Sequence, residues 1–195
     1  VVLGYGDTLQ SHVDGEAAAQ LSRLVEAGEH VVDLTEDLRT LLDAILDERT
    51  ERPVALRPTL AETADHIRAE HEGATVRIDG EIPAVDVLAD DMLHSVFRNL
   101  LVNAVTHNDT AEPHVEVSAT THDGRAVVTI ADDGPGIPDE RKEAVFEKEV
   151  TDASDAGGVG LYLVRTLVER YGGRARIEDN EPRGSVVILE FETVD

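Results

Sequence analysis

The sequence predicts an α+β protein in which a helical hairpin precedes a two-layer α/β sandwich, a sheet covered by helices on one face. Three observations lead to this prediction. Apolar residues recur at helical spacing over residues 16–46. After Arg52, short alternating segments typical of strands are interleaved with apolar helical segments. Two glycine-rich turns punctuate this second part, one after a strand and one before a helix.

The first 50 residues form the predicted hairpin. Val13-Asp14-Gly15 is a plausible turn, and the apolar repeat of residues 16–46 is roughly heptad-like. A hairpin this thin cannot bury both of its apolar faces alone, so we expect it to pair with a second copy in a four-helix bundle. The alternative is that the hairpin packs on its own neighbouring domain. The predicted domains are residues 1–50 and 51–195, with a boundary near Arg52.

The second domain is predicted element by element. Short strands are expected at 54–56, 75–79 and 85–88, and longer ones at 115–121, 126–131, 174–178 and 185–192. Helices are expected at 59–71, 91–109, 139–147 and 161–171. Asp123-Gly124 is a strong hairpin turn between two of the strands. Residues 151–158 are small and polar, which predicts a loop.

The helix at 91–109 carries an unusual polar stripe. Ser95, Asn99, Asn103 and His107 follow one another at intervals of four, so they project from one face of a helix that is otherwise mostly apolar. A buried amide without a partner is unfavourable. These side chains therefore meet other polar groups or face a ligand.

Two glycine turns favour the ligand. Asp132-Asp133-Gly134-Pro135-Gly136-Ile137-Pro138 follows a strand, and Gly157-Gly158-Val159-Gly160 opens a helix. Glycines allow a backbone to approach a ligand closely, and a helix N-terminus offers free N–H groups to phosphate oxygens. Each turn alone is a weak signal, but their order and spacing after the amide stripe are specific.

These motifs resemble the ATP-binding domain of sensor histidine kinases, in the superfamily that includes gyrase and MutL. Asn99-Leu-Leu-Val-Asn103-Ala104 is similar to the N box, and residues 132–138 to the G1 box. Val145-Phe146-Glu147 resembles the F box, and Gly158-Val159-Gly160-Leu161-Tyr162-Leu163-Val164 the G2 box. The resemblance runs from about Pro53 to the C-terminus and implies the Bergerat fold. Thr106, Val159 and Tyr162 depart from the family's usual residues.

The resemblance implies ATP and Mg²⁺ as cofactors and assigns roles to individual residues. The family's matching aspartate accepts the adenine amine, which assigns Asp132. Asn103 matches the Mg²⁺ ligand, and an amide oxygen is a hard donor suited to that ion. Asn99 stands where hydrolytic relatives have a glutamate, and an amide cannot act as a base, which favours phosphate transfer over hydrolysis. The implied set is Asn99 as catalytic residue, Asn103 as metal ligand, and Asn99, Asn103, His107, Asp132, Gly134, Gly136, Ile137, Lys148, Gly158, Val159, Gly160 and Leu161 as nucleotide-binding residues.

The resemblance also implies a reaction. The γ-phosphate of ATP would pass to a histidine and then to an aspartate of a response-regulator receiver domain. Residues 1–5 resemble the segment that follows the phosphoaccepting histidine, which places that histidine upstream of Val1. His12 and His30 lie in the hairpin, but neither is followed by the acidic residue of the family's pattern. Two alternatives remain open: a serine kinase that regulates a partner as anti-sigma kinases do, and a nucleotide-binding scaffold without catalysis.

The amino-acid composition argues against some classes of binding partner. The net charge is -24, and only Lys142 and Lys148 are lysines among the 17 basic residues, a composition that resembles proteins of salt-accumulating archaea. This charge argues against nucleic acid or an anionic membrane as a direct partner. There is no cysteine, so disulfides and thiolate metal sites are excluded. No apolar run reaches the ~18 residues of a membrane span. We expect a cytoplasmic location, which is compatible with attachment of the full-length protein to a membrane.

Overall fold

The computed structural model describes residues 51–147 and 159–194, together with isolated positions between 17 and 39. The chain divides into two units, Val1–Ile45 and Leu46–Asp195. The isolated described positions of the first unit are helical. Most of the predicted hairpin lies outside the described residues, so the hairpin, its dimer and the 1–50 and 51–195 domains stay predictions. The second unit contains the amide stripe and both glycine turns.

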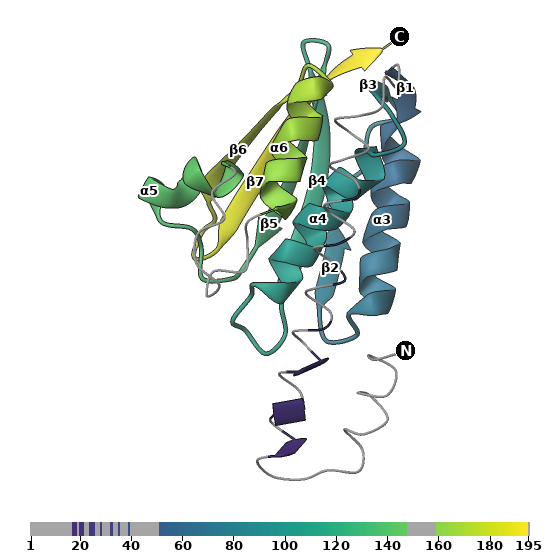
Figure 1. The fold of residues 1–195 in the computed structure, drawn as a ribbon. Helices are drawn as coiled ribbons and strands as arrows, with labels where there is room; N and C mark the ends of the chain where they lie inside the picture. The colour runs from purple at the N-terminus through teal and green to yellow at the C-terminus, as the bar shows by residue number, and fades with distance from the viewer. Residues whose placement is uncertain are drawn as a thin grey trace. The chain divides into compact units, whose positions relative to one another are not determined.

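A mixed sheet forms one layer of this unit (Figure 1). The strands run in the order β1-β3-β7-β5-β4-β2, and β6 also pairs with β7. Among the described strand pairs, β2 and β4 are parallel and the others are antiparallel. The strands are β1 (Arg52–Ala55), β2 (Thr75–Ile78), β3 (Asp86–Ala89), β4 (His114–His122), β5 (Arg125–Asp132), β6 (Arg174–Asp179) and β7 (Ser185–Val194).

Turn chemistry and alternation fix the register at the centre of the sheet. Asp123 and Gly124 both have positive φ, as a two-residue hairpin turn requires. This turn pairs His122 with Arg125 and Val115 with Asp132. Alternate β4 residues are buried, beginning at Val115, which is the period of a strand with one covered face. The register brings the end of β5 to the edge where the glycine turn begins.

Three helices cover one face of the sheet: α3 (Leu56–Glu70), α4 (Leu93–Thr106) and α6 (Gly160–Arg170). Each turns an apolar stripe to the strands, as an amphipathic helix does. Phe97 of α4 meets Phe191 of β7 edge to face, with ring centroids 6.4 Å apart. The two-layer α/β sandwich predicted from the sequence is confirmed.

The start of α3 differs from the prediction. We expected a strand at 54–56 and a helix from Thr59, because Pro53 and Pro58 suggested a linker. The helix begins at Leu56, which is fully buried and donates its N–H to Val85 O at 3.0 Å. Pro58 lies in the first helical turn, where a missing N–H breaks no intrahelical bond. Proline there is compatible with a helix start.

The segment after the first glycine turn also differs. Instead of one helix over 139–147, the chain forms α5 (Asp139–Lys142) and a 3₁₀ turn, η1 (Ala144–Phe146). Phe146 at the end of η1 is buried. Lys142 forms ion pairs with Asp139 at 2.6 Å and with Asp179 at 2.8 Å, the latter linking α5 to β6. Along the part of the chain that is described, no helix is both long and apolar enough to cross a membrane.

Candidate functional site

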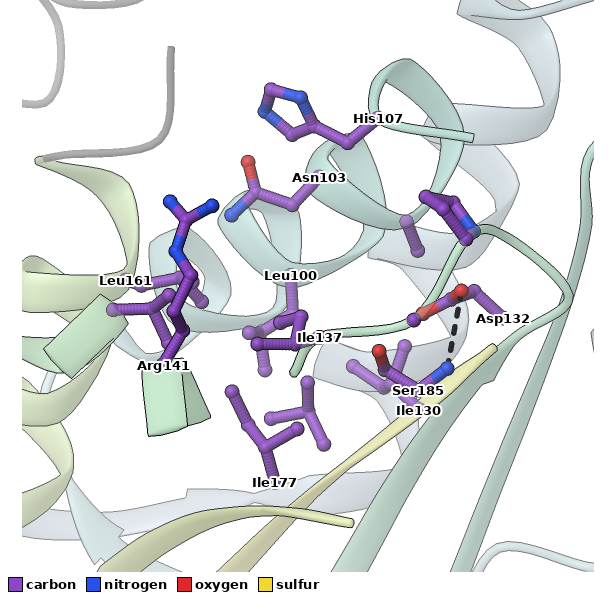
Figure 2. A pocket seen from close by; sticks show the side chains of 15 residues that line it. Leu100, Asn103, His107, Ile130, Asp132, Ile137, Arg141, Leu161, Ile177 and Ser185 are labelled. Atoms are coloured by element: carbon purple, nitrogen blue, oxygen red, sulfur yellow. Dashed lines mark hydrogen bonds between the residues drawn. The ribbon is translucent and has the colours of Figure 1, made fainter. Parts of the chain in front are cut away.

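A cavity of about 220 Å³ opens between α4, the end of β5 and the start of α6 (Figure 2). It brings together residues that are far apart in the sequence. Of the predicted site residues, those that line it are Asn103, His107, Asp132, Gly136, Ile137 and Leu161. Residues that the sequence reasoning did not assign to it are Leu100, Ala104, Ile130, Pro135, Arg141, Val145, Ile177, Ser185 and Val187. The additional residues are mostly apolar and form the walls of a slot.

Asp132 supplies the carboxylate at one end of this slot. Its Oδ1 accepts hydrogen bonds from the N–H of Gly134 at 2.9 Å and from the N–H of Ser185 at 3.3 Å. Burial raises the pKa of the Asp132 carboxyl and repulsion from Asp133 adds to the rise, while the two N–H donors oppose it. The side chain is thus oriented before any ligand arrives, with Oδ1 held by the protein.

The turn between β6 and β7 supports Asp132 from behind. Asn180 donates its Nδ2 to the backbone O of Asp132 at 2.8 Å. Gly184 has φ +111°, and a Cβ built on it would lie 1.9 Å from that same oxygen. Only glycine allows the two backbones to pass this closely. The sequence predicted no role for the segment between the strands expected at 174–178 and 185–192, and the glycine directly before the second strand was the signal available.

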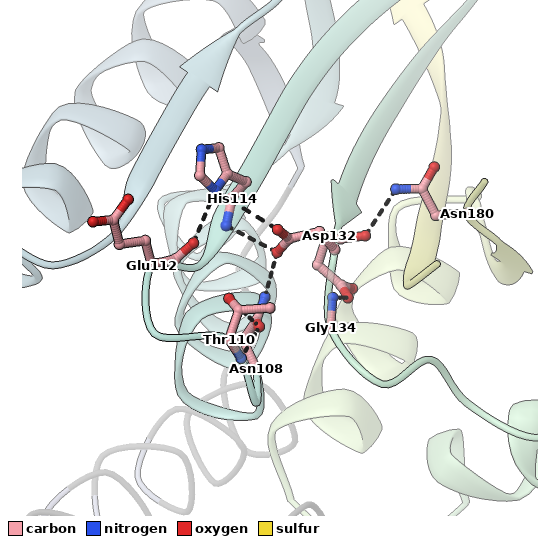
Figure 3. A network of polar contacts seen from close by, with 8 residues as sticks. Asn108, Thr110, Glu112, His114, Asp132, Gly134 and Asn180 are labelled. Atoms are coloured by element: carbon pink, nitrogen blue, oxygen red, sulfur yellow. Dashed lines mark hydrogen bonds and ion pairs between the residues drawn. The ribbon is translucent and has the colours of Figure 1, made fainter. Parts of the chain in front are cut away.

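The next residue, Asp133, holds a second loop in place (Figure 3). Its Oδ1 accepts from Asn108 Nδ2 at 2.7 Å and from the N–H of His114 at 2.9 Å. Burial alone would raise the pKa of Asp133, but these two donors outweigh it and hold the pKa below its usual value. Arg183 also pairs with Asp109. The α4–β4 loop, the first glycine turn and the β6–β7 turn are therefore locked together.

The polar stripe of α4 reaches the cavity only in part. Asn103 and His107 line the slot, and Figure 2 shows Asn103 and Arg141 across the cavity from Asp132. Asn99 lies one turn earlier, outside the cavity lining, and donates its Nδ2 to Ser95 O at 3.1 Å.

The remaining predicted residues lie around the slot. Gly134 holds Asp132 through its N–H but does not line the cavity. Val159 precedes α6 and Gly160 begins it. Lys148 and Gly158 lie outside the described residues.

A metal ion would take few ligands from the protein here. Within 51–147 and 159–194 there is no group of three or more His, Cys, Asp or Glu side chains that could hold one. Asn103 lines the slot, and its carboxamide oxygen is a hard, neutral donor. Mg²⁺ keeps several waters and binds readily through one protein oxygen plus phosphate oxygens. The residues present fit Mg²⁺ delivered with a polyphosphate ligand.

An apolar slot that ends in the half-buried carboxylate of Asp132 thus lies between the helices and the mixed sheet of this two-layer domain. Residues 89–195 match the model of the histidine kinase-, DNA gyrase B- and HSP90-like ATPase family. The chain belongs to this family.

Curated relatives of the chain are named sensor histidine kinases. The chain is 30% identical to the sensor histidine kinase AruS of Pseudomonas aeruginosa over 209 aligned positions, covering 98% of this chain and 21% of AruS. It is 27% identical to the sensor histidine kinase ZraS of Salmonella typhimurium over 159 positions, covering 81% of this chain and 30% of ZraS. The chain thus spans less than a third of these relatives' length. They support its assignment as a histidine kinase catalytic core.

Solved structures agree on the fold. The mycobacterial sensor histidine kinase MprB superposes with a TM-score of 0.65 at 24% identity, covering 73% of this chain and 97% of that one. Full-length ShkA, solved in complex with AMPPNP, superposes with a TM-score of 0.70 at 26% identity, covering 99% of this chain and 43% of ShkA. None of these comparisons tests the predicted salt-accumulating archaeal origin, which stays a prediction.

Proposed function

We propose that this chain binds ATP with Mg²⁺ and that the full protein transfers the γ-phosphate to a histidine outside residues 1–195, then to a response-regulator aspartate. One observation carries the proposal: a preorganised carboxylate, Asp132, and a metal-compatible amide, Asn103, line the same apolar slot. The family match over residues 89–195 supports ATP as the nucleotide. The proposed location is the cytoplasm, where ATP and receiver domains are found.

The base end of the slot is built for adenine. Because Gly134 and Ser185 occupy Oδ1 of Asp132, its Oδ2 is the oxygen that accepts from the exocyclic amine. Ile130, Ile177 and Val187 offer flat apolar surface to the ring. If the base carried a carbonyl at this position, its oxygen and the carboxylate would both be hydrogen-bond acceptors and would repel each other. The slot therefore favours adenine over guanine.

The phosphate end uses the helices and a cation. Bound Mg²⁺ would neutralise charge on the phosphate oxygens during transfer, and Asn103 is the residue that would hold it. Arg141 is a lining residue whose guanidinium carries positive charge to the same side of the slot. The backbone of Val159 and Gly160 at the start of α6 belongs to the proposed phosphate set. The family resemblance of the sequence adds Gly158 and Lys148 to that set.

Asn99 distinguishes transfer from hydrolysis in this proposal. A carboxamide cannot remove a proton from water, so Asn99, one turn before Asn103, would leave the γ-phosphate in place until an acceptor imidazole arrives. The proposed acceptor is presented by a dimer formed through the N-terminal hairpin. Regulation of a partner by serine phosphorylation, and nucleotide binding without transfer, are the competing functions of the same fold.

Labelled ATP separates these functions. We expect full-length protein incubated with γ-labelled ATP to incorporate acid-labile phosphate and to pass it to a receiver domain. The 195-residue chain alone should bind ATP without labelling itself, because His12 and His30 lack the acceptor pattern. Acid-stable phosphate on a partner serine would favour the serine kinase, and absence of label on full-length protein would favour the scaffold.

The metal role of Asn103 can be tested by substitution. Asn103→Ala should abolish the dependence of ADP affinity on Mg²⁺, because the side-chain ligand is lost while Asp132 still binds the base. Titration calorimetry with and without EDTA should show about tenfold metal dependence in the wild-type chain and little in the variant. Ser95→Ala, two turns earlier on the same helix, is the matched control and should behave as wild type. Unchanged metal dependence in Asn103→Ala would remove Asn103 from the site.

A further inference from the structure

A buried polar cluster lies at the other end of the helices that form the slot. We call Asp90, Arg170 and Tyr171 the distal hub. Asp90 is 4% exposed and lies three residues before the first residue of α4, and Tyr171 is 1% exposed and follows the last residue of α6. No step of the proposed reaction uses these residues. Burying a carboxylate and a phenol beside a partly buried guanidinium requires a structural or functional reason.

The contacts of the hub join the ends of the two helices. Oδ1 of Asp90 accepts from the hydroxyl of Tyr171 and from the N–H of Met92 at 2.8 Å. Nη2 of Arg170 lies 3.6 Å from Oδ2 of Asp90, which is buried without a hydrogen-bond partner. The acidic side chain lies at the start of α4 and the basic one at the end of α6, the arrangement that suits both helix dipoles. Burial, followed by the bond to Asp90, raises the pKa of Tyr171, so the phenol stays protonated as a donor.

The two helices run in opposite directions between the hub and the slot. The slot receives Asn103 from the last turns of α4 and Leu161 from the first turn of α6. The hub joins Asp90, three residues before α4 begins, to the residues that end α6, about 15 Å along the helices from the slot at 1.5 Å per residue. Figure 1 shows α4 and α6 side by side on the sheet. The hub thus fixes the relative position of the two helices at the end remote from the ligand.

The base end of the slot is held by other contacts. Asp132 is oriented by Gly134, Ser185 and Asn180, which lie on the first glycine turn, on β7 and in the β6–β7 turn. None of these three residues is on α4 or α6. A change at the hub should therefore shift the helices against each other while leaving the carboxylate that reads the base in place.

We propose that Asp90, with Arg170 and Tyr171, is a positioning residue that sets the start of α6 against Asn103 and so controls phosphate affinity independently of base affinity. The proposal rests on the proposed function of the slot. It assigns the hub no contact with the nucleotide. A change at the hub should therefore alter the affinity for ligands that have phosphates and leave the affinity for ligands that lack them unchanged.

Tyr171→Phe tests this with little change in volume. We expect ADP with Mg²⁺ to bind about tenfold more weakly, while adenosine affinity stays within about twofold of wild type. Thr166→Val is the matched control, because it too removes a hydroxyl, one that lies within α6 and bonds to Tyr162 O of the same helix at 2.8 Å. The control should leave both affinities unchanged. A merely structural role for Tyr171 would weaken adenosine and ADP together, or neither, and either result would overturn the proposal.

A second measurement does not depend on the nucleotide. The N–H of Leu163, which donates to Val159 O at 2.8 Å, reports on the first turn of α6, and the N–H of Ser185 reports on the base end. In Tyr171→Phe, hydrogen exchange at Leu163 should accelerate more than at Ser185. Equal acceleration at both amides would contradict the proposal.

If Tyr171→Phe fails to fold, the same affinities and exchange rates are compared in Asp90→Asn. This variant keeps an acceptor for the Tyr171 hydroxyl and the Met92 N–H and removes only the attraction to Arg170. If the wild-type chain binds neither adenosine nor ADP, the proposed function fails and this inference fails with it. Wild-type binding together with equal losses for both ligands would refute the inference alone.

Discussion

Asp132→Asn is expected to abolish specific adenine binding without destabilising the empty protein. The two backbone donors hold Oδ1, and the asparagine oxygen can accept from both. The amide NH₂ must then take the place of Oδ2 and face the adenine amine, so a donor meets a donor. Losing a charged acceptor and leaving a donor unpaired should weaken ADP binding about 100-fold.

The stability of the same variant depends on the direction of the pKa shift. Burial raises the pKa of Asp132 above its value in the unfolded chain. The contribution of Asp132 to folding stability is then fully present below the unfolded pKa of about 3.9 and is lost as pH rises through the folded pKa. Asparagine carries no charge, so the unfolding midpoint of Asp132→Asn relative to wild type should rise between pH 4 and pH 7.

Thermal unfolding with and without ADP at both pH values measures the two effects together. Wild-type protein should gain stability from ADP, and the variant should gain almost none. The result that would refute the site is a variant that still binds ADP as tightly as wild type. A variant whose empty form is much less stable at pH 7 would show instead that the Asp132 carboxylate is needed for folding.

Gly184→Ala is expected to have the largest effect on stability. The new Cβ would lie 1.9 Å from the backbone O of Asp132 and 2.7 Å from its backbone carbon. Neither atom can move freely, because that oxygen also accepts from Asn180. Strain at φ +111° and the overlap together should cost about 3 kcal/mol or more. Nucleotide binding should be lost as well, since relief of the clash displaces Asp132.

Gly80→Ala is the matched control. Gly80 also has positive φ, +73°, but a Cβ there would meet nothing within 4 Å. Its cost should be limited to the left-handed conformation, roughly 1–2 kcal/mol, with ADP binding retained. Denaturant titration gives both free energies of unfolding. Equal losses in the two alanine variants would mean that close approach at Gly184 does not support the site.

Local sequence patterns predicted most of the second unit. The alternation of 126–131 and the Asp-Gly pair fixed the β4–β5 hairpin, and the apolar spacing of 91–109 predicted α4 to within three residues at each end. The errors fell where a local signal was ambiguous. Pro58 reads as a linker residue but also suits a first helical turn, and residues 139–147 are too short for helical periodicity to predict the break at Glu143.

The sequence alone also predicted both ends of the slot, since Asn103 and Asp132 belong to motifs whose spacing is local. Only the tertiary structure decided what holds them. Asn180 and Ser185 reach Asp132 across 48 and 53 residues, and Tyr171 reaches Asp90 across 81. Periodicity records which face of an element is apolar, but it carries no information about which elements become neighbours. Sheet order placed β7 between β5 and β6, and that placement brought Gly184 against Asp132 and made glycine necessary there.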